Sequence, residues 1–154
     1  MLKKSLIENN AIKLNQQADN WQDAIKIAVD MLISAGCAEE RYLENIVKGI
    51  KEHGPYIILA PGLAMPHARP EDGVIKSGFS LVTFKHPVYF EGEDSPVYMM
   101  IALAGSDANA HMEGLVEITQ VLDDPESETG VNIDKFRQCQ TEQDVLRVLD
   151  TALV

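Results

Sequence analysis

Cysteine is scarce in this sequence: two residues, Cys37 and Cys139, occur among 154. They are isolated and form no Cys-x-x-Cys pair, so zinc and redox sites built on that motif are excluded. One disulfide between them is an alternative, but two buried free thiols in a reducing cytoplasm are expected. The four histidines lack His-Glu-x-x-His and His-x-His spacing, so no metal site is expected.

Positive charge is also in short supply, with 13 Lys and Arg against 24 Asp and Glu and a formal net charge of −11. Because the phosphates of nucleic acid require a basic surface, no nucleic-acid partner is expected. No apolar run approaches the ~20 residues that span a bilayer, and the two lysines near the N-terminus precede no long apolar region, so no secretory signal is expected. These absences favour a cytoplasmic protein.

The apolar content of 45% is that of an ordinary globular protein, and the length predicts a single domain over residues 1–154. Helical spacing or capping signals predict helices at residues 20–35, 39–52 and 141–152, with a short one at 132–139. A third main helix, containing residues 112–122, is expected after a turn at residues 105–109. The alternation at residues 11–14 suits an edge strand, and short apolar runs predict strands at residues 56–60, 79–84 and 97–104. Helices interleaved with short strands indicate the α/β class, with a mixed β-sheet flanked by helices on both faces.

Three elements carry specific packing expectations. Residues 56–60 read as a buried strand, and residues 97–104, apolar without alternation, as a central strand covered on both faces. Trp21 is expected in the core. The third main helix is expected to turn inward Met112, Leu115, Val116, Thr119 and Leu122.

The most informative stretch is the proline-rich run at residues 60–70, which contains His67. Its three prolines make the backbone stiff and unable to form a helix, and Gly62 allows a tight turn. A preorganised segment of this kind needs little further ordering to present a reactive imidazole. The alternative is a surface turn in which His67 has no role.

The run Gly62-Leu-Ala-Met-Pro-His-Ala-Arg-Pro70, followed by Glu71-Asp-Gly73 and the strand-like residues 77–84, resembles the enzyme IIA domain of the bacterial sugar phosphotransferase system. Within the mannitol/fructose-type family it is most similar to the ascorbate-specific IIA component. The resemblance implies that His67 carries a phosphoryl group, and that His111 matches the family's second histidine. Many mannitol-type members have glutamate where Pro61 is found and arginine where Lys51 is found, and these departures favour the ascorbate-like branch.

This resemblance implies a phosphocarrier that takes phosphate from HPr and passes it to a cysteine on a cognate IIB component, with sugar entering through a separate membrane component, IIC. No cofactor is implied, because the group passes between protein side chains, and the absence of a Gly-x-x-x-x-Gly-Lys loop agrees that ATP is not the donor. A neutral His67 would accept the group in line while nearby donors stabilise its oxygens. His111, Arg69 and Lys51 are the candidate phosphate ligands. The expected docking surface is centred on Leu63, Ala64, Met65 and Ala68.

Other functions remain open at this stage. IIA-like domains also occur as regulatory modules of the nitrogen-related type, although the lack of an attached DNA-binding region disfavours that role here. The sugar could be a pentitol or another sugar acid. A metal-dependent hydrolase using His67, Asp107 and His111 is the weakest alternative.

Overall fold

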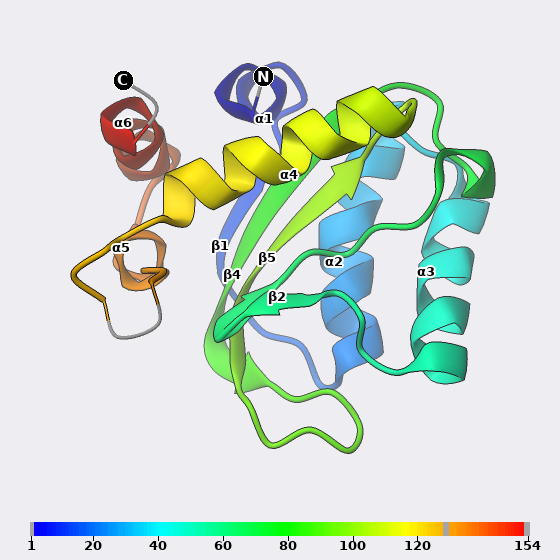
Figure 1. The fold of residues 1–154 in the computed structure, drawn as a ribbon, viewed down its shortest axis with the longest axis horizontal. Helices are drawn as coiled ribbons and strands as arrows, with labels where there is room; N and C mark the ends of the chain where they lie inside the picture. The colour runs from blue at the N-terminus through cyan, green and yellow to red at the C-terminus, as the bar shows by residue number, and fades with distance from the viewer. Residues whose placement is uncertain (1, 128–129, 153–154) are drawn as a thin grey trace.

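The computed structural model describes residues 2–127 and 130–152, and in these ranges the chain forms a five-stranded mixed sheet with the strand order β1-β4-β5-β3-β2 (Figure 1). The strands are β1 (Ile12–Gln16), β2 (Ile58–Ala60), β3 (Gly62–Ala64), β4 (Gly78–Val88) and β5 (Val97–Ala104). The helices are α1 (Leu2–Glu8), α2 (Trp21–Ser34), α3 (Glu40–His53), α4 (Ala108–Leu122), α5 (Asp134–Arg137) and α6 (Glu142–Ala152), with a 3-10 turn, η1 (Pro70–Asp72).

The sheet mixes both kinds of pairing. β4 and β5 pair antiparallel in the middle, β1 runs parallel to β4, β3 runs parallel to β5, and β2 is antiparallel to β3 at the second edge. All of β5 except the half-buried Tyr98 is buried, which confirms the prediction of a central strand covered on both faces. The expected edge strand near residues 11–14 is also confirmed.

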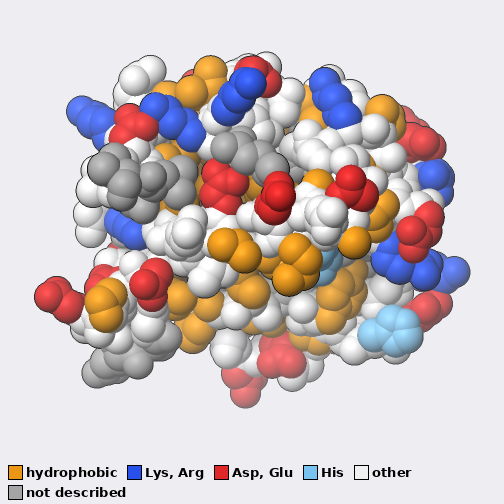
Figure 2. Space-filling model, turned by 45° about the horizontal axis from the view of Figure 1, so that its top comes forward, with side chains coloured by type: hydrophobic (Ala, Val, Ile, Leu, Met, Phe, Trp, Pro, Cys, Tyr) orange, Lys and Arg blue, Asp and Glu red, His pale blue; other side chains and the backbone are white. Residues whose placement is uncertain are grey.

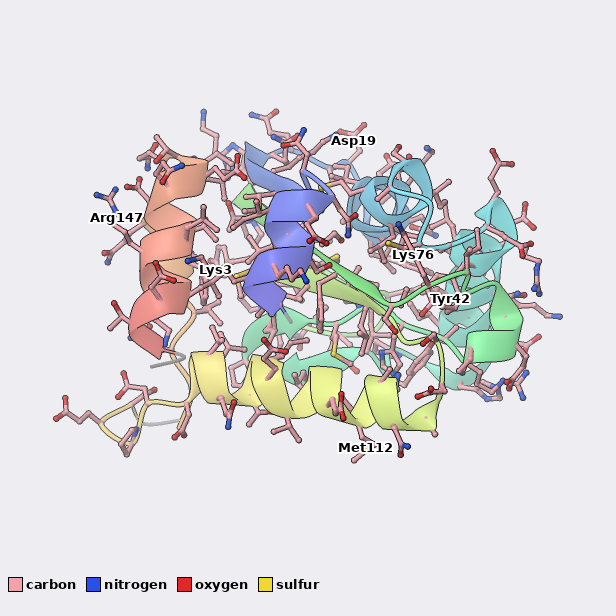
Figure 3. The ribbon with its side chains drawn as sticks, turned by 90° about the horizontal axis from the view of Figure 1, so that it is seen from above. Lys3, Asp19, Tyr42, Lys76, Met112 and Arg147 are labelled. Carbon is pink, nitrogen blue, oxygen red and sulfur yellow. The ribbon has the colours of Figure 1, made fainter. Side chains whose placement is uncertain are left out.

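Helices cover both faces of this sheet, as the sequence predicts. α2 packs on β4 and β5, and α3 packs in turn against α2, whereas α4 crosses the opposite face (Figures 1 and 3). α2 begins as expected, because the Asn20 side chain accepts a hydrogen bond from Asp23 N at 2.8 Å. Trp21 lies in the core with its ring centroid 5.6 Å from that of Phe90. No helix in residues 2–127 and 130–152 is both long and apolar enough to cross a membrane.

The expected inward face of α4 is wrong in part. Met112 and Val116 are 58% and 53% exposed, and Thr119 is exposed as well, whereas Leu122 is buried and Leu115 half-buried as expected. The other buried positions are Gly114, Ile118 and Val121. The cause is close packing at Gly114, where an added Cβ would lie 3.0 Å from Leu103 Cδ1 and 3.1 Å from Phe79 Cζ. The helix therefore approaches the sheet through its glycine, and the larger apolar side chains next to it turn outward.

One further expectation needs adjustment, and another is confirmed. The strand predicted at residues 56–60 was expected to be buried, but it is shorter, Ile58–Ala60. It lies at the sheet edge with β3 as its only neighbouring strand, and Leu59 is largely exposed. Cys37 and Cys139 are both buried and free, as predicted.

Candidate functional site

The segment that carries His67 leaves the sheet directly after β3 and keeps sheet-like hydrogen bonds. Met65 N donates to Ile57 O at 2.7 Å, and Leu103 N donates to Pro66 O at 3.0 Å. The prolines prevent a helix here, as predicted, and the pairing with β5 continues past the last residue assigned to β3. His67 is therefore attached to the central strand of the sheet by the residue that precedes it.

Two tyrosines hold the other side of this segment. The buried Tyr42 hydroxyl donates to Leu103 O at 2.7 Å and accepts from Ala68 N at 3.0 Å. Burial raises the pKa of Tyr42 well above its usual value, so this hydroxyl remains a donor at any physiological pH. The Tyr56 hydroxyl donates to His67 O at 2.7 Å. Backbone groups on both sides of the His67 ring thus have defined partners.

The ring of His67 has a fixed tautomer when it is neutral. Its Nδ1 lies 2.6 Å from Met65 O, and because a carbonyl oxygen can only accept, the proton is on Nδ1 and the lone pair is on Nε2. Burial lowers the pKa of His67 below its ordinary value of 6.5; the Met65 bond opposes this effect and the nearby His111 adds to it. The neutral, nucleophilic form is therefore favoured at neutral pH.

His111 lies in the first turn of α4, and its ring centroid is 5.1 Å from that of His67. Asp107 caps the helix by accepting from Ala110 N at 2.8 Å. Gly105 allows the close approach, since a Cβ there would lie 2.9 Å from His111 Cα. The prediction that the two histidines lie side by side is confirmed; the role of His111 in holding a phosphoryl group stays a prediction.

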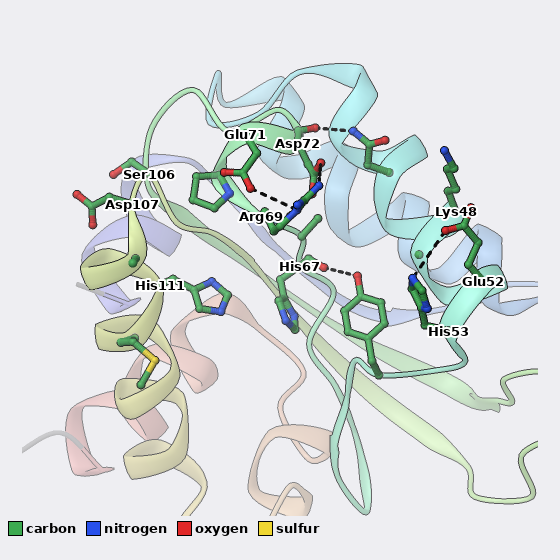
Figure 4. Close-up of a pocket in the computed structure, with 17 residues that line it drawn as sticks. Lys48, Glu52, His53, His67, Arg69, Glu71, Asp72, Ser106, Asp107 and His111 are labelled. Carbon is green, nitrogen blue, oxygen red and sulfur yellow. Dashed lines mark hydrogen bonds and ion pairs between the residues drawn. The ribbon is translucent and has the colours of Figure 1, made fainter.

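Both histidines open into one cleft of about 1210 Å³ between η1, the end of α3 and the start of α4 (Figure 4). This exceeds the roughly 300–1,000 Å³ of a usual small-molecule pocket, and it suits an approaching protein surface. Arg69 lines the cleft, and its guanidinium pairs with Glu71 and Asp72, each at 3.3 Å. An incoming phosphate would have to compete with these two carboxylates for Arg69.

Lys51 does not reach this cleft. It lines a neighbouring depression on α3 together with Leu43 and Val47, and Lys48 lines both this depression and the cleft that contains His67. The position of Lys51 on the helix therefore gives no geometric support to its expected role in binding the phosphoryl group, and that role stays a prediction.

The expected docking surface is also corrected. Leu63 and Ala64 are fully buried and Met65 is 2% exposed, because β3 pairs with β5 inside the sheet. These three side chains cannot contact a partner, and only the half-buried Ala68 remains at the cleft. A different apolar surface lies beside His111: the exposed Met112 and Val116, one helical turn apart on α4, which we call the apolar ridge. Figure 2 shows hydrophobic side chains gathered along α4 next to a histidine.

The hydrolase alternative gains no geometric support. In the described ranges, no group of three or more His, Cys, Asp and Glu side chains is placed to hold a metal ion. Asp107, which that alternative needs, is used as the α4 cap.

The residues that sequence reasoning missed are Tyr42 and Tyr56. Each precedes His67 by many positions and looks like an ordinary core or edge residue. The available signal is chemical: a tyrosine that is buried needs a partner for its hydroxyl, and the loop carbonyls and amides near His67 need partners as well.

Comparison with known proteins gives consistent matches over nearly the whole chain. A family model described as phosphoenolpyruvate-dependent sugar phosphotransferase system, EIIA 2, matches residues 5–152. The ascorbate-specific PTS system EIIA component of Shigella boydii serotype 4 (strain Sb227) is 49% identical over 151 residues, covering 97% of this chain and 95% of that protein.

Solved structures show the same likeness. A protein described as PTS IIA (PtxA) from Streptococcus mutans has a TM-score of 0.90 at 34% identity, covering 98% of this chain and 94% of that chain. The complex of enzyme IIA mannitol with phosphorylated enzyme IIB mannitol from Escherichia coli matches with a TM-score of 0.76 at 25% identity, covering 94% of this chain and 95% of that chain. These likenesses confirm the expected α/β fold class.

We predict that the pKa of His67 measured by NMR titration of its ring lies below 6.5, because burial and His111 disfavour the charged ring. A lowered pKa means that the ring stays neutral as the pH falls and becomes protonated only below its ordinary range. His111→Ala should raise the pKa of His67, since it removes a like charge and part of the burial. A His67 pKa above 6.5, or one that falls in His111→Ala, would contradict this prediction.

Proposed function

This chain belongs to the phosphoenolpyruvate-dependent sugar phosphotransferase system EIIA 2 family, and on that premise we propose that it is a phosphocarrier with a phosphohistidine intermediate at His67. It accepts the phosphoryl group from phospho-HPr and passes it to a cognate IIB component. The group finally reaches a sugar that enters through a membrane IIC component. These partners are cytoplasmic or face the cytoplasm, and we place this chain there too.

The observation that carries the proposal is the free Nε2 of a neutral His67. Met65 O holds the proton on Nδ1, so the lone pair of Nε2 is available without any base having to remove a proton. Burial keeps the ring in this form. A histidine held this way is a nucleophile in its resting state, which suits repeated acceptance of a phosphoryl group.

The transfer step moves the phosphoryl group from a ring nitrogen of the donor phosphohistidine to Nε2 of His67. The P–N bond of the donor phosphohistidine breaks as the bond between phosphorus and His67 Nε2 forms, and the donor ring keeps the electron pair of the broken bond. Passage to IIB reverses the roles, with a IIB cysteine sulfur attacking phosphorus and His67 Nε2 leaving. Since such transfer states are loose, the protein contributes mainly position and charge.

His111 is the proposed donor to the phosphoryl oxygens. With ring centroids 5.1 Å apart, one phosphoryl group on His67 lies within reach of both rings. A protonated His111 would stabilise the transferred charge without becoming phosphorylated itself. Arg69 is a second proposed donor to the phosphoryl oxygens, and to act as one its guanidinium must first break its ion pairs with Glu71 and Asp72.

We predict that His67→Ala abolishes acid-labile phosphorylation by phosphoenolpyruvate, enzyme I and HPr, as followed by mass spectrometry. His111→Ala should slow transfer by about tenfold to a hundredfold. Removing one hydrogen-bond donor from a dry site lowers the rate by ~10²–10³, and the loss should be smaller here because the cleft is open to water. His86→Ala, which changes an exposed histidine away from the cleft, is the control and should transfer at the wild-type rate. Phosphorylation of His67→Ala would disprove the assignment of the carrier residue.

The apolar ridge is the proposed contact surface for the protein partners. Met112 lines the cleft and Val116 continues the exposed surface away from it. A partner that brings its own reacting side chain to His67 must cover this rim. The IIA mannitol protein of Escherichia coli, which shares this fold, is named in a complex with phosphorylated IIB, and we propose the same kind of pairing for this chain.

We predict that Met112→Asp and Val116→Asp each raise the KM for phospho-HPr by about tenfold, since truncating a central apolar contact typically costs more than ~1 kcal/mol. The kcat and the melting temperature should change little, because both side chains are exposed. Gln143→Asp, which adds the same charge on the exposed start of α6, should leave the KM unchanged. Wild-type KM values in both ridge variants would show that docking occurs elsewhere.

The proposed sugar is L-ascorbate, because the relative at 49% identity is named an ascorbate-specific EIIA component and Pro61 and Lys51 depart from the mannitol-type pattern. We predict that this gene restores growth on ascorbate to a bacterium lacking its own ascorbate-specific EIIA component, and that the His67→Ala gene does not. Neither gene should rescue a strain that lacks mannitol-specific IIA. Rescue on mannitol alone would reject ascorbate and keep the carrier role. Phosphorylation without rescue on any sugar would favour the regulatory alternative.

A further inference from the structure

Tyr56 contacts His67 in two independent ways. Its hydroxyl donates to the main-chain carbonyl of His67 at 2.7 Å, drawn as a dashed line in Figure 4. Its ring meets the imidazole edge to face, with centroids 5.4 Å apart and an interplanar angle of 82°. Burial, with a smaller contribution from Asp72, raises the pKa of Tyr56, so the hydroxyl keeps its proton and stays a donor.

The Tyr56 ring is itself positioned by the end of α3. A Cβ added to Gly49 would lie 3.4 Å from Tyr56 Cε1 and 3.5 Å from its hydroxyl oxygen. The ring therefore rests against the helix where no side chain intervenes. Its backbone is tied to the same place, since Tyr56 N donates to Gly54 O at 2.8 Å. Tyr56 thus connects a rigid helix end to the histidine.

The two Tyr56 contacts restrict motions of the His67 ring that the hydrogen bond to Met65 still permits. The bond from Nδ1 to Met65 O fixes the tautomer, but one hydrogen bond alone permits the imidazole to swing about it. The edge of the Tyr56 ring limits that motion, and the hydroxyl fixes the peptide unit from which the side chain projects. Phosphoryl transfer needs the attacking nitrogen in line, and a misplacement of about 1 Å can cost roughly a hundredfold in rate.

We propose that Tyr56 is a positioning residue for phosphoryl transfer, which holds the His67 backbone and ring so that Nε2 keeps one direction in the cleft. The proposal rests on the carrier role of His67. Tyr56 is 44% exposed, so its ring contributes less to the core than a fully buried aromatic side chain does. Its removal therefore affects the order of His67 more than it affects folding.

The first test measures the ring without any phosphoryl donor. In wild-type protein, ¹⁵N NMR should show a single neutral tautomer of His67, with the proton on Nδ1 and slow exchange of that proton. Tyr56→Phe keeps the ring and should speed this exchange several-fold, whereas Tyr56→Leu removes both contacts and should also broaden the ring signals. Tyr89→Phe is the matched control, because Tyr89 has a similar exposure of 50% and does not line the cleft.

The second test separates positioning from docking by steady-state transfer from phospho-HPr. Tyr56→Phe should lower kcat by about threefold to tenfold, the loss expected for one neutral hydrogen bond. Tyr56→Leu should lower kcat by about tenfold to a hundredfold. In both variants the KM should stay near the wild-type value. A raised KM with unchanged kcat would overturn the proposal and make Tyr56 a contact of the partner.

A third variant acts on Tyr56 without changing it. Gly49→Leu places a side chain where the Tyr56 ring lies and should reproduce the NMR and kcat changes of Tyr56→Leu, even if the latter folds poorly. Wild-type ring signals and kcat in Tyr56→Phe and Gly49→Leu together would overturn the proposal. Failure of wild-type protein to accept phosphate would instead contradict the carrier role, and the donor-free NMR result would still decide whether Tyr56 orders His67.

Discussion

The site depends on one short hydrogen bond, from His67 Nδ1 to the carbonyl of Met65 two residues earlier. A contact over so few residues needs a chain that cannot relax into a helix, and Pro66 between the two partners enforces that condition. The bond also requires that the Met65 carbonyl be fixed. The burial of Met65 and the bond from Met65 N to Ile57 O fix it, so the tautomer of the reactive ring is set by the edge of the sheet.

Two opposing influences then act on the charge of that ring. Burial and the neighbouring His111 disfavour the protonated form, while the Met65 carbonyl favours it, and the net result is a lowered pKa. The balance has a functional meaning. A deeper imidazole could not meet a partner, and a fully exposed one would be protonated more often and would lose its lone pair. The half-buried position of His67 lets the ring remain neutral while Nε2 stays accessible.

Much of this could be predicted from sequence, and the failures share one physical origin. The order of apolar runs predicts the mixed sheet, the proline-rich run predicts the stiff segment, and the family motif predicts that His67 and His111 meet. The buried state of Leu63 to Met65 could not be predicted, because it results from pairing with β5 far along the chain. The orientation of α4 was missed for the same reason: apolar residues surround much of this helix, and only close packing at Gly114 selects its buried face.

The packing at Gly114 affects both the chemistry at His67 and the surface that a protein partner would contact. Successive helical residues are about 100° apart, so fixing Gly114 and Ile118 against the sheet places His111, two turns before Ile118, on the same side and near His67. Met112 then necessarily points about 100° away, onto the rim. One glycine contact therefore sets the chemical group inside the cleft and the apolar ridge outside it. A side chain at position 114 would lift the helix and disturb both together, which links the chemistry of the site to its recognition surface through a residue that takes part in neither.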